Sequence, residues 1–446
     1  MKKLIITLSF IIGHLSLSPA GAKTYTLQQL KDSALQNNIA LRTARHDMEN
    51  ARQQRKEAFT KYFPNVSGTG LWFNANKGMA QTAVNPSEVI PSSLTPTLAA
   101  SLPAEALAAL ASPVTISMMK NGTIGSLMAV QPVFAGGQIV NGNRLAKVGE
   151  EVSRLQLQLS QQEVEKQTEQ YYWQLVSLQE KVKTIDAVDT LLADIAKDVS
   201  VAVRAGVVLR NDLLQVQLRQ NDVASQRLKL QNGISIIRLL LAQYCGLRDT
   251  SIVLSANVQR SMFNVQRSTF NVQCTPEYQL LDKQVEATSL QHKMEIGKNL
   301  PSVAVGAGYN YHNLLDRNHT FGMVFATVSV PISNWWGGSH AIKRKKIAQQ
   351  QAEEQRADNA QLLQIRMQNA WNSVIEAQQQ LQLAQRSIEQ SEENLRLHRD
   401  YYRAGTCKMS DLLEAQLLYQ QTLDKQTNAF ADLQNKQLEY RQSIGQ

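Results

Sequence analysis

The chain of 446 residues lacks proline and glycine over unusually long stretches. No proline occurs in residues 133–275 or 332–446, and Gly405 is the only glycine between Ser339 and Ile444. Proline costs about 3 kcal/mol in a helix interior and glycine about 1 kcal/mol, so little in these stretches interrupts a helix. A helix over residues 339–402 would be roughly 95 Å long at about 1.5 Å per residue. That length excludes an ordinary globular bundle core for this segment.

Several other features are scarce, and each scarcity excludes a class of protein. The cysteines Cys245, Cys274 and Cys407 are too few and too scattered for a disulfide framework. Cys245 and Cys274 flank one linker and either pair after export or remain thiols. No apolar run of about 18 residues follows the N-terminus, which excludes helical membrane spans.

Sequence motifs of enzymes are missing as well. The chain has no phosphate-binding loop, no metalloprotease helix and no nucleophile elbow. His312 and His319 lie near a predicted strand end, but two histidines without carboxylates nearby are typical of a surface. We therefore expect no enzymatic activity, no cofactor and no metal site.

The N-terminal residues 1–22 have the pattern of a secretory signal peptide. Lys2 and Lys3 precede an apolar stretch over residues 4–12, and Ala20-Gly21-Ala22 offers a small-residue cleavage site. The formal net charge of +9 and the pI of about 9.3 would suit nucleic acid, but an exported chain does not meet it. We therefore expect no nucleic acid partner.

Two breaks in the long proline-free stretches share one sequence pattern and lie 199 residues apart. Arg204-Ala205-Gly206 corresponds to Arg403-Ala404-Gly405, and Asp212 corresponds to Asp411. A fixed offset of this kind is the signature of an internal repeat. The sequence therefore contains one structural unit that is duplicated.

Each repeat contains an apolar stripe with coiled-coil spacing. Apolar residues on alternating three- and four-residue steps give a mean period near 3.5, which is typical of coiled-coil packing. The other faces are rich in Gln, Glu, Lys and Arg, as water-exposed helix faces require. In the second repeat the stripe consists of Met367, Ala370, Val374, Ala377, Leu381, Ala384, Ile388, Leu395 and Tyr402.

Between the helices lie four runs that alternate as β-strands do. Each has about the length that a tilted strand needs to cross a bilayer, although a buried soluble sandwich fits the alternation equally well. Aromatic residues near the run ends are typical of a membrane-interface belt. The runs are 63–75, 123–134, 302–312 and 321–332, and the aromatic residues are Trp72, Phe134, Trp335 and Trp336.

Four strands are too few to close a membrane barrel, because bacterial barrels begin at about eight. An open sheet edge is not tolerated in lipid. We therefore expect each chain to supply a fraction of a barrel and to oligomerise, with the long helices projecting from the membrane. A periplasmic adaptor or a fibrous scaffold protein also has long helices. The adaptor would need glycine-rich lipoyl-like halves, and the scaffold leaves the strands unexplained.

The order of these elements resembles the TolC-like outer-membrane efflux proteins over essentially the whole mature chain. The resemblance rests on the N-terminal helix that closes at Phe63-Pro64, and on QPVFAGGQIVNGNRLAK with its partner SVPISNWWGGSHAIKRKK. It rests also on the turn YYRAGTCKMSDLLEAQ. The resemblance implies a mainly α fold with a membrane β-barrel portion, and a homotrimeric tube with a twelve-stranded barrel and a periplasmic helical barrel.

The same resemblance implies a function and partners. It predicts an outer-membrane exit duct in a Gram-negative bacterium, which passively conducts substrates in efflux or type I secretion. Its partners would be a periplasmic adaptor (membrane fusion protein), an inner-membrane pump of the RND or ABC type, and outer-membrane lipid.

Particular residues acquire roles through the resemblance. Asp411 and Glu414 match an acidic pair that lines the constriction, and Tyr402 matches a gate tyrosine with Asp212 as its acceptor. An aspartate early in a helix also stabilises the helix dipole, so both aspartates have a purely structural alternative. Cys407 stands where some relatives carry a basic residue. The adaptor-docking turns comprise Arg204, Ala205, Gly206, Arg403, Ala404, Gly405 and Thr406.

The predicted organisation follows the duplication. A first repeat at 23–246 contains an external loop at 76–121 and a helical hairpin at 138–245. A linker occupies 247–274, and the second repeat at 275–446 contains a hairpin at 339–444.

Overall fold

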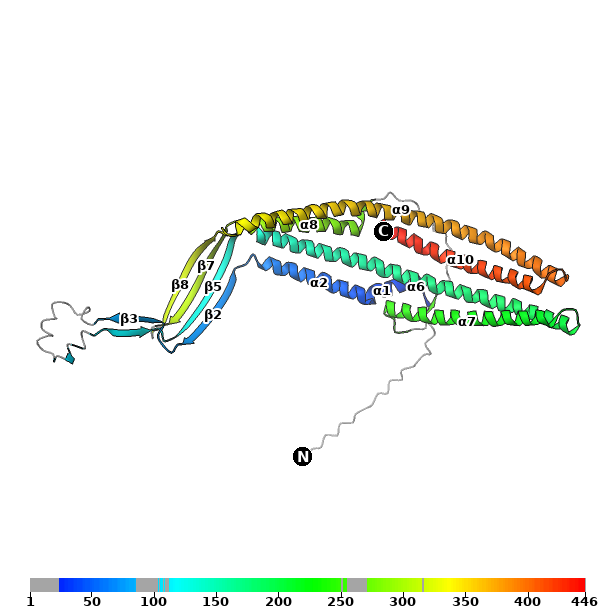
Figure 1. Cartoon of the computed structure of the whole chain (residues 1–446), viewed down its shortest axis with the longest axis horizontal. Coiled ribbons are helices and arrows are strands. Elements are labelled where there is room, and N and C mark those ends of the chain that lie inside the picture. Colours follow the sequence, from blue (N-terminus) through cyan, green and yellow to red (C-terminus); the bar gives the residue numbers. More distant parts are fainter. Residues whose placement is uncertain are drawn as a thin grey trace, which may run out of the picture. The chain divides into compact units, whose positions relative to one another are not determined.

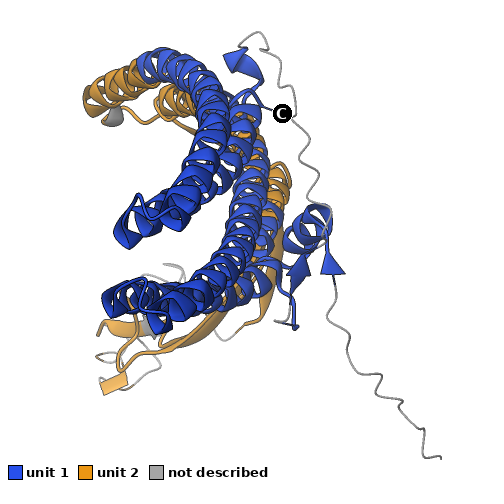
Figure 2. Ribbon diagram, turned by 90° about the vertical axis from the view of Figure 1, so that its right-hand side faces the viewer, with its two compact units in different colours: residues 1–50, 151–283, 353–446 blue, residues 51–150, 284–352 orange. Residues whose placement is uncertain are grey.

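The structure is a computed structural model, and it describes residues 24–85, 103, 105–106, 108, 112–249, 252–254, 271–314 and 317–445. The predicted signal peptide and most of the linker lie outside these residues. The chain divides into two compact units (Figure 2). Unit 1 comprises residues 1–50, 151–283 and 353–446, and unit 2 comprises residues 51–150 and 284–352.

Long helices dominate the chain, as the missing prolines predict (Figure 1). The first hairpin joins α6 (Gln138–Arg204) to α7 (Arg210–Cys245), and the second joins α9 (Asn334–Arg403) to α10 (Met409–Ser443). Shorter helices are α1 (Leu27–Asn37), α2 (Ile39–Thr60) and α8 (Pro276–Gly297). No helix in the described ranges is both long enough and apolar enough to cross a bilayer.

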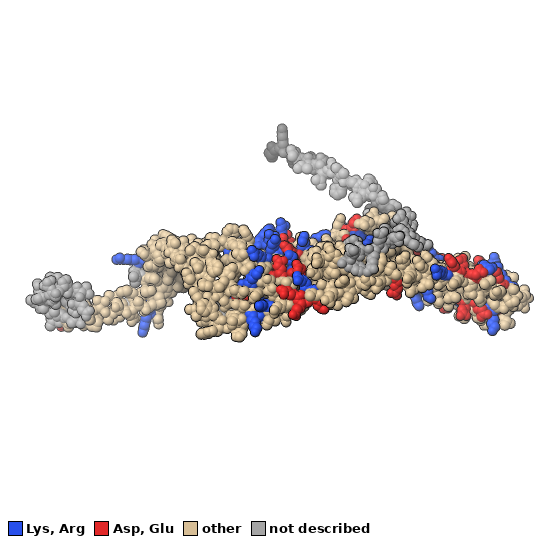
Figure 3. Space-filling model, turned by 90° about the horizontal axis from the view of Figure 1, so that it is seen from above, with Lys and Arg blue, Asp and Glu red and all other residues tan. Residues whose placement is uncertain are grey.

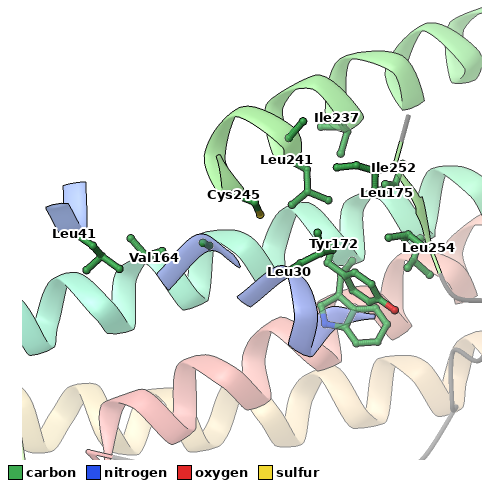
Figure 4. Close-up of a cluster of buried hydrophobic side chains, with 14 residues drawn as sticks. Leu30, Leu41, Val164, Tyr172, Leu175, Ile237, Leu241, Cys245, Ile252 and Leu254 are labelled. Carbon is green, nitrogen blue, oxygen red and sulfur yellow. The ribbon is translucent and has the colours of Figure 1, made fainter. Parts of the chain in front are cut away.

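The apolar stripes form the helix contacts of unit 1. Met367, Val374, Ala377 and Leu381 of the second-repeat stripe are buried. The largest cluster gathers side chains from α1, α2, α6 and α7 and from the segment of β6 (Val253–Leu254). Figure 4 shows this cluster, in which Leu30, Leu175 and Leu241 are fully buried. Burying one such side chain stabilises the fold by about 1.5–3 kcal/mol.

The N-terminal helix is divided at Asn38, where the sequence alone suggests one continuous helix. Asn38 has an extended backbone conformation, with φ −59° and ψ 134°. Its Nδ2 donates to the carbonyl of Tyr244 at 3.0 Å, and its Oδ1 accepts from the amide of Ala40 at 2.9 Å. The side chain therefore caps α2 and ties the break to the end of α7, a tertiary contact that periodicity does not predict.

Unit 2 contains a four-stranded antiparallel sheet in the order β2-β5-β7-β8. The strands are β2 (Asn65–Asn74), β5 (Asn121–Ala135), β7 (Ser302–Asn313) and β8 (His319–Ser329). Strands β2 and β7 each begin directly after a proline, Pro64 and Pro301, which lacks the amide proton that a ladder needs. A bulge between Pro132 and Phe134 shifts the register of β5 against β7.

No residue of these four strands is Asp, Glu, Lys or Arg. In Figure 3 the surface over the sheet is correspondingly almost free of charged side chains. Strand β2 is exposed along nearly its whole length, and β8 is exposed except at one position. Within the part of the chain that the structure describes, β2 and β8 each have one unpaired edge.

The segment 76–121 differs from its prediction as a loop. It contains a second, two-stranded antiparallel sheet of β3 (Ala80–Val84) and β4 (Val114–Met118). Alternation over only five residues is too short to stand out in the sequence. Its prolines, at positions 86–113, lie between the two strands.

The two glycine pairs that precede the long helices are not equivalent. Gly136 and Gly137 have φ +60° and +74° and form a true turn before α6. Gly337 and Gly338 lie within the first turns of α9, so this helix begins at Asn334 and not at the predicted residue 339. Trp335 Nε1 donates to the carbonyl of Asn299 at 3.0 Å, and this anchor helps the helix to begin early despite its glycines.

The described part of the linker is not wholly irregular. Strand β6 pairs in parallel with β1 (Thr24–Tyr25), and a 3₁₀ turn covers Val272–Cys274. All three cysteines are free, with Cys245 buried and Cys274 exposed. The alternative of a disulfide between Cys245 and Cys274 therefore does not hold.

Candidate gate and docking turns

The two hairpin turns have the same backbone geometry. Gly206 and Gly405 are left-handed, with φ +73° and +74°. Val207 donates its amide to the carbonyl of Ala202 at 2.9 Å, and Thr406 donates to Tyr401 at 2.9 Å. This bond across five residues, with a glycine before the donor, closes the end of a helix in a Schellman motif. The duplication therefore extends to individual hydrogen bonds.

Both glycines face open space. A side chain at either position would meet no other atom within 4 Å, so only the left-handed backbone requires glycine. The flanking residues Arg204, Ala205, Arg403, Ala404 and Thr406 are all exposed. The turn surface is therefore free within unit 1 to contact another molecule.

Asp411 lies in the first turn of α10 and caps the start of the helix. Its Oδ2 accepts from the amide of Lys408 at 3.3 Å, and its Oδ1 accepts from the hydroxyl of Ser410 at 3.0 Å. These bonds support the structural role of an aspartate at a helix start. Glu414, one turn further on, is exposed and has no hydrogen bond or ion pair among the described residues. Asp411 and Glu414 are thus neighbours on one helix, and only Asp411 has local partners.

Tyr402 lies in a small apolar cluster with Val199, Val216 and Met409, which joins the two hairpins. Burial, and then the nearby Asp212 carboxylate, raise the pKa of the Tyr402 hydroxyl. The hydroxyl is buried, yet in the described residues it has no partner at the distance and angle of a hydrogen bond. The predicted pair is therefore close together. A side-chain interaction with Asp212 contributes to the raised pKa, although it does not reach the geometry of a regular hydrogen bond.

A polar connection between the hairpins is not predicted by the sequence pattern. Arg219 on α7 donates from Nε to Gln416 Oε1 at 3.0 Å and from Nη2 to Gln420 Oε1 at 2.7 Å. Gln420 in turn donates to Gln226 Oε1 at 2.8 Å. Both α10 glutamines are almost fully buried, and burial lowers the pKa of Arg219. Gln416 lies four residues after Leu412 and therefore on the same helix face; a glutamine on the face of an apolar residue is the signal that could have indicated this site.

Weaker contacts surround this connection. Arg403 Nη2 lies 4.0 Å from Asp198 Oδ2, and both side chains are more than half exposed, so the pair contributes little stability. Cys407 Sγ approaches the carbonyl of His398 at 3.5 Å. Burial, with Asp411 as a smaller cause, raises the pKa of this thiol. No group of three or more metal-ligand side chains gathers in the described residues.

The predicted interface aromatics are all exposed in unit 2, at 46–81% of their surface. Trp72 pairs with Thr123 near one end of β5, and Phe134 lies near the other end. The 11 residue-to-residue steps from Thr123 to Phe134 span about 36 Å at about 3.3 Å per residue. With a strand tilt of about 40°, the rise is about 28 Å, close to the apolar band of a membrane barrel.

Solved outer membrane channels share the fold of this chain. CusC has 15% sequence identity and a TM-score of 0.78, covering 94% of this chain and 92% of that chain. VceC from Vibrio cholerae has 14% identity and a TM-score of 0.73, with coverage of 94% and 96%. CmeC from Campylobacter jejuni has 15% identity and a TM-score of 0.73, with coverage of 100% and 94%.

Sequence comparison adds a family. Residues 276–446 match the model of the outer membrane efflux protein family, whereas comparison with curated protein sequences gave no match. The fold is that of TolC-like outer membrane channels.

Proposed function

We propose that the protein is the outer membrane exit duct of a tripartite efflux or type I secretion system in a Gram-negative bacterium. It conducts passively what an inner-membrane pump and a periplasmic adaptor deliver. Its working form is a homotrimer, in which three four-stranded sheets close into one twelve-stranded barrel. The helical hairpins of the three copies form the periplasmic part of the duct.

The uncharged open sheet carries this proposal. A sheet with both faces uncovered and both edges unpaired is unstable in water and impossible as an isolated sheet in lipid. Closure with two more copies pairs every edge, and insertion into a bilayer covers the apolar outer face. The absence of Asp, Glu, Lys and Arg from all four strands suits a membrane position, because a cationic side chain on the lipid face costs about 2–4 kcal/mol at the midplane.

The turns and the neighbouring acidic residues form the functional end of the duct in this proposal. The exposed segments 204–207 and 403–406 dock the adaptor. Asp411 and Glu414 of three copies line the constriction, and Tyr402 with Asp212 holds it closed. The unsatisfied Tyr402 hydroxyl beside Asp212 supports this assignment, because a small movement of either hairpin would complete a bond.

Purification and bilayer recording test the proposal together. The protein extracted from outer membranes should migrate as a heat-modifiable trimer and open discrete channels in planar bilayers. Deletion of the gene should raise susceptibility to the substrates of its pump. A stable monomer with a closed barrel, or a trimer without channel activity, would contradict the proposal.

A further inference from the structure

The positive charge of the chain is concentrated in unit 2. That unit contains 15 Lys and Arg against 7 Asp and Glu, a formal charge of +8 out of +9 for the whole chain. In Figure 3 the Lys and Arg side chains form a band across helices. Twelve of the 15 cations, against four acids, lie in the segments that adjoin the sheet, 51–64, 136–150, 284–300 and 330–352.

Part of this charge lines a groove between α2 and α6 with a volume of about 680 Å³. Asn143 Nδ2 donates to the carbonyl of Ala58 at 2.9 Å and joins the two helices. The only carboxylate in the lining is that of Glu150, which pairs with Arg55 at 2.8 Å. The cations of the groove are Arg52, Arg55, Lys56, Arg144 and Lys147.

Two of these cations have no counter-charge. Lys56 and Arg144 are exposed and make no ion pair or side-chain hydrogen bond in the described part of the chain. A groove with five cations and one already paired carboxylate has a positive potential. It favours an anionic ligand, and a phosphate group fits the planar donors of Arg144.

Aromatic rings border the same groove. Phe59 and Tyr62 line it, and they pack edge-to-face with centroids 5.6 Å apart. Phe63 packs against Phe59 at 5.7 Å. These rings are 56%, 39% and 57% exposed respectively. A cluster of exposed aromatic rings beside cations is typical of the interface between acyl chains and phosphates in a bilayer.

The groove also lies at the correct level, if the sheet is the membrane wall of the proposed duct. Lys56 is four residues before the end of α2, and Arg144 is six residues after the start of α6. At about 1.5 Å per residue, both cations are about 6–9 Å beyond the helix ends that adjoin the strands. That is where the phosphates of the adjoining leaflet would be.

We propose that this groove binds the phosphate of an anionic phospholipid in the membrane leaflet next to these helices. Lys56 and Arg144 contact the phosphate, and Phe59 and Tyr62 contact the glycerol and the upper acyl chains. The inference rests on the proposed membrane position of the sheet. A soluble anion would use the cations alone, and only a lipid also uses the exposed rings.

Closure of the barrel would bring further cations to this region, which would favour an anionic ligand more strongly. Helix α2 leads into edge strand β2, and α9 follows the opposite edge strand β8. In a closed oligomer these edges meet, so α2 of one copy adjoins α9 of the next. Helix α9 carries four consecutive cations, Lys343, Arg344, Lys345 and Lys346, about 14–18 Å from its start. The cations of α2 and α9 repel one another when these helices adjoin. Lipid phosphate between the copies relieves this repulsion.

The test compares lipid binding by the purified full-length oligomer and by two variants. Phosphatidylglycerol and phosphatidylcholine with identical acyl chains are titrated, and bound lipid is counted by native mass spectrometry. The double variant Lys56→Gln/Arg144→Gln should bind phosphatidylglycerol about 30-fold more weakly than wild type, which corresponds to about 2 kcal/mol for the two cations together. Phosphatidylcholine binding should not change. The matched control Arg42→Gln/Lys229→Gln removes two exposed cations of unit 1 and should behave as wild type.

Three results would overturn the lipid site. These are equal binding of both lipids by wild type, unchanged phosphatidylglycerol binding by the double variant, and competition by soluble glycerol phosphate at the same concentration as the lipid. Channel recording of each sample separates this inference from the proposed function. Normal conductance without a lipid preference would reject the lipid site alone, whereas a lipid preference without conductance would reject the duct.

Discussion

Arg219 on α7 reaches across to Gln420 on α10, with 2.7 Å between Nη2 and Oε1. The two residues belong to different hairpins, and the bond continues through Gln420 to Gln226. Since Gln416 also accepts from Arg219, one guanidinium holds two buried side chains of the second hairpin. Any movement that separates α7 from α10 has to break these bonds first.

Replacing Arg219 with Met should loosen this connection. The change leaves Gln416 and Gln420 buried without their donor, which costs about 1–3 kcal/mol. We expect a lower thermal stability of the oligomer and a higher resting conductance in planar bilayers. Arg210→Gln, an exposed substitution on the same helix, is the control. Equal conductance of both variants would show that the connection does not limit opening.

Substitutions at Gly405 should separate backbone geometry from bulk. Gly405→Val forces a β-branched residue into a left-handed conformation at a cost of about 1–3 kcal/mol, although the surrounding space is open. Asparagine in Gly405→Asn adopts the left-handed conformation more easily. We expect the valine, and not the asparagine, to abolish efflux in susceptibility assays while trimers remain in the membrane; the same contrast should hold at Gly206. Full efflux by the valine variants would remove the turns from the docking site.

Neutralising the acidic pair tests the constriction. The double substitution Asp411→Asn/Glu414→Gln changes little volume, and the introduced asparagine amide retains one acceptor oxygen for the α10 cap. Two charges about 4 Å apart interact by about 4 kcal/mol at an effective dielectric of 20, so a ring of six carboxylates binds multivalent cations. The variant should lose cation selectivity and cation block in single-channel recordings. The control Glu376→Gln, at an exposed acid of α9, should keep both the selectivity and the block. If the double variant kept the block, Asp411 would be a helix cap only.

Tyr402→Phe should affect the gate without affecting stability. The hydroxyl has no hydrogen bond of regular geometry in the described residues, so its removal should leave the thermal midpoint unchanged or slightly higher. If the bond to Asp212 forms only in the closed assembly, the resting conductance should rise. Tyr401→Phe, at the exposed neighbouring position, controls for the loss of a hydroxyl. An unchanged conductance would limit Tyr402 to its packing in the apolar cluster.

Cys245 should make the stability of unit 1 sensitive to alkaline pH. Burial raises the pKa of its thiol to about 12, whereas an unfolded thiol has a pKa of about 8.5. The folded state therefore holds the proton longer, and the corresponding stability is complete below about pH 8.5 and is lost as pH rises towards 12. The loss is roughly 1.4 kcal/mol per pH unit. Thermal unfolding between pH 8 and 11 should be less pH-dependent in Cys245→Ala, and parallel pH profiles would refute this account.

The sequence predicted the helices and strands well because their signals are local. Missing prolines and a sustained apolar period determine α6 and α9, and alternation determines β7 and β8. Helix α9 begins five residues before its predicted start, because the contact between Trp335 and Asn299 offsets the cost of the two glycines. The division at Asn38 depends on a carbonyl more than 200 residues away, which no local pattern contains.

The candidate site was predictable only in part. The duplication indicated the turns, and the structure gives both turns the same bonds. The bonding of Tyr402 depends on the relative position of two hairpins, which periodicity does not specify. The Arg219 connection also depends on this position, and its two glutamines are among several buried polar residues of α10.

The equivalence of the two turns bears on the symmetry of any docking surface. Each chain presents two turns whose helix ends close with the same hydrogen bonds, but whose neighbouring side chains differ. In a trimer these become six sites of similar shape in two chemical kinds, which alternate around the axis. A partner with a single type of hairpin could engage all six positions, but with two different affinities. The three stronger sites would then fill before the three weaker ones.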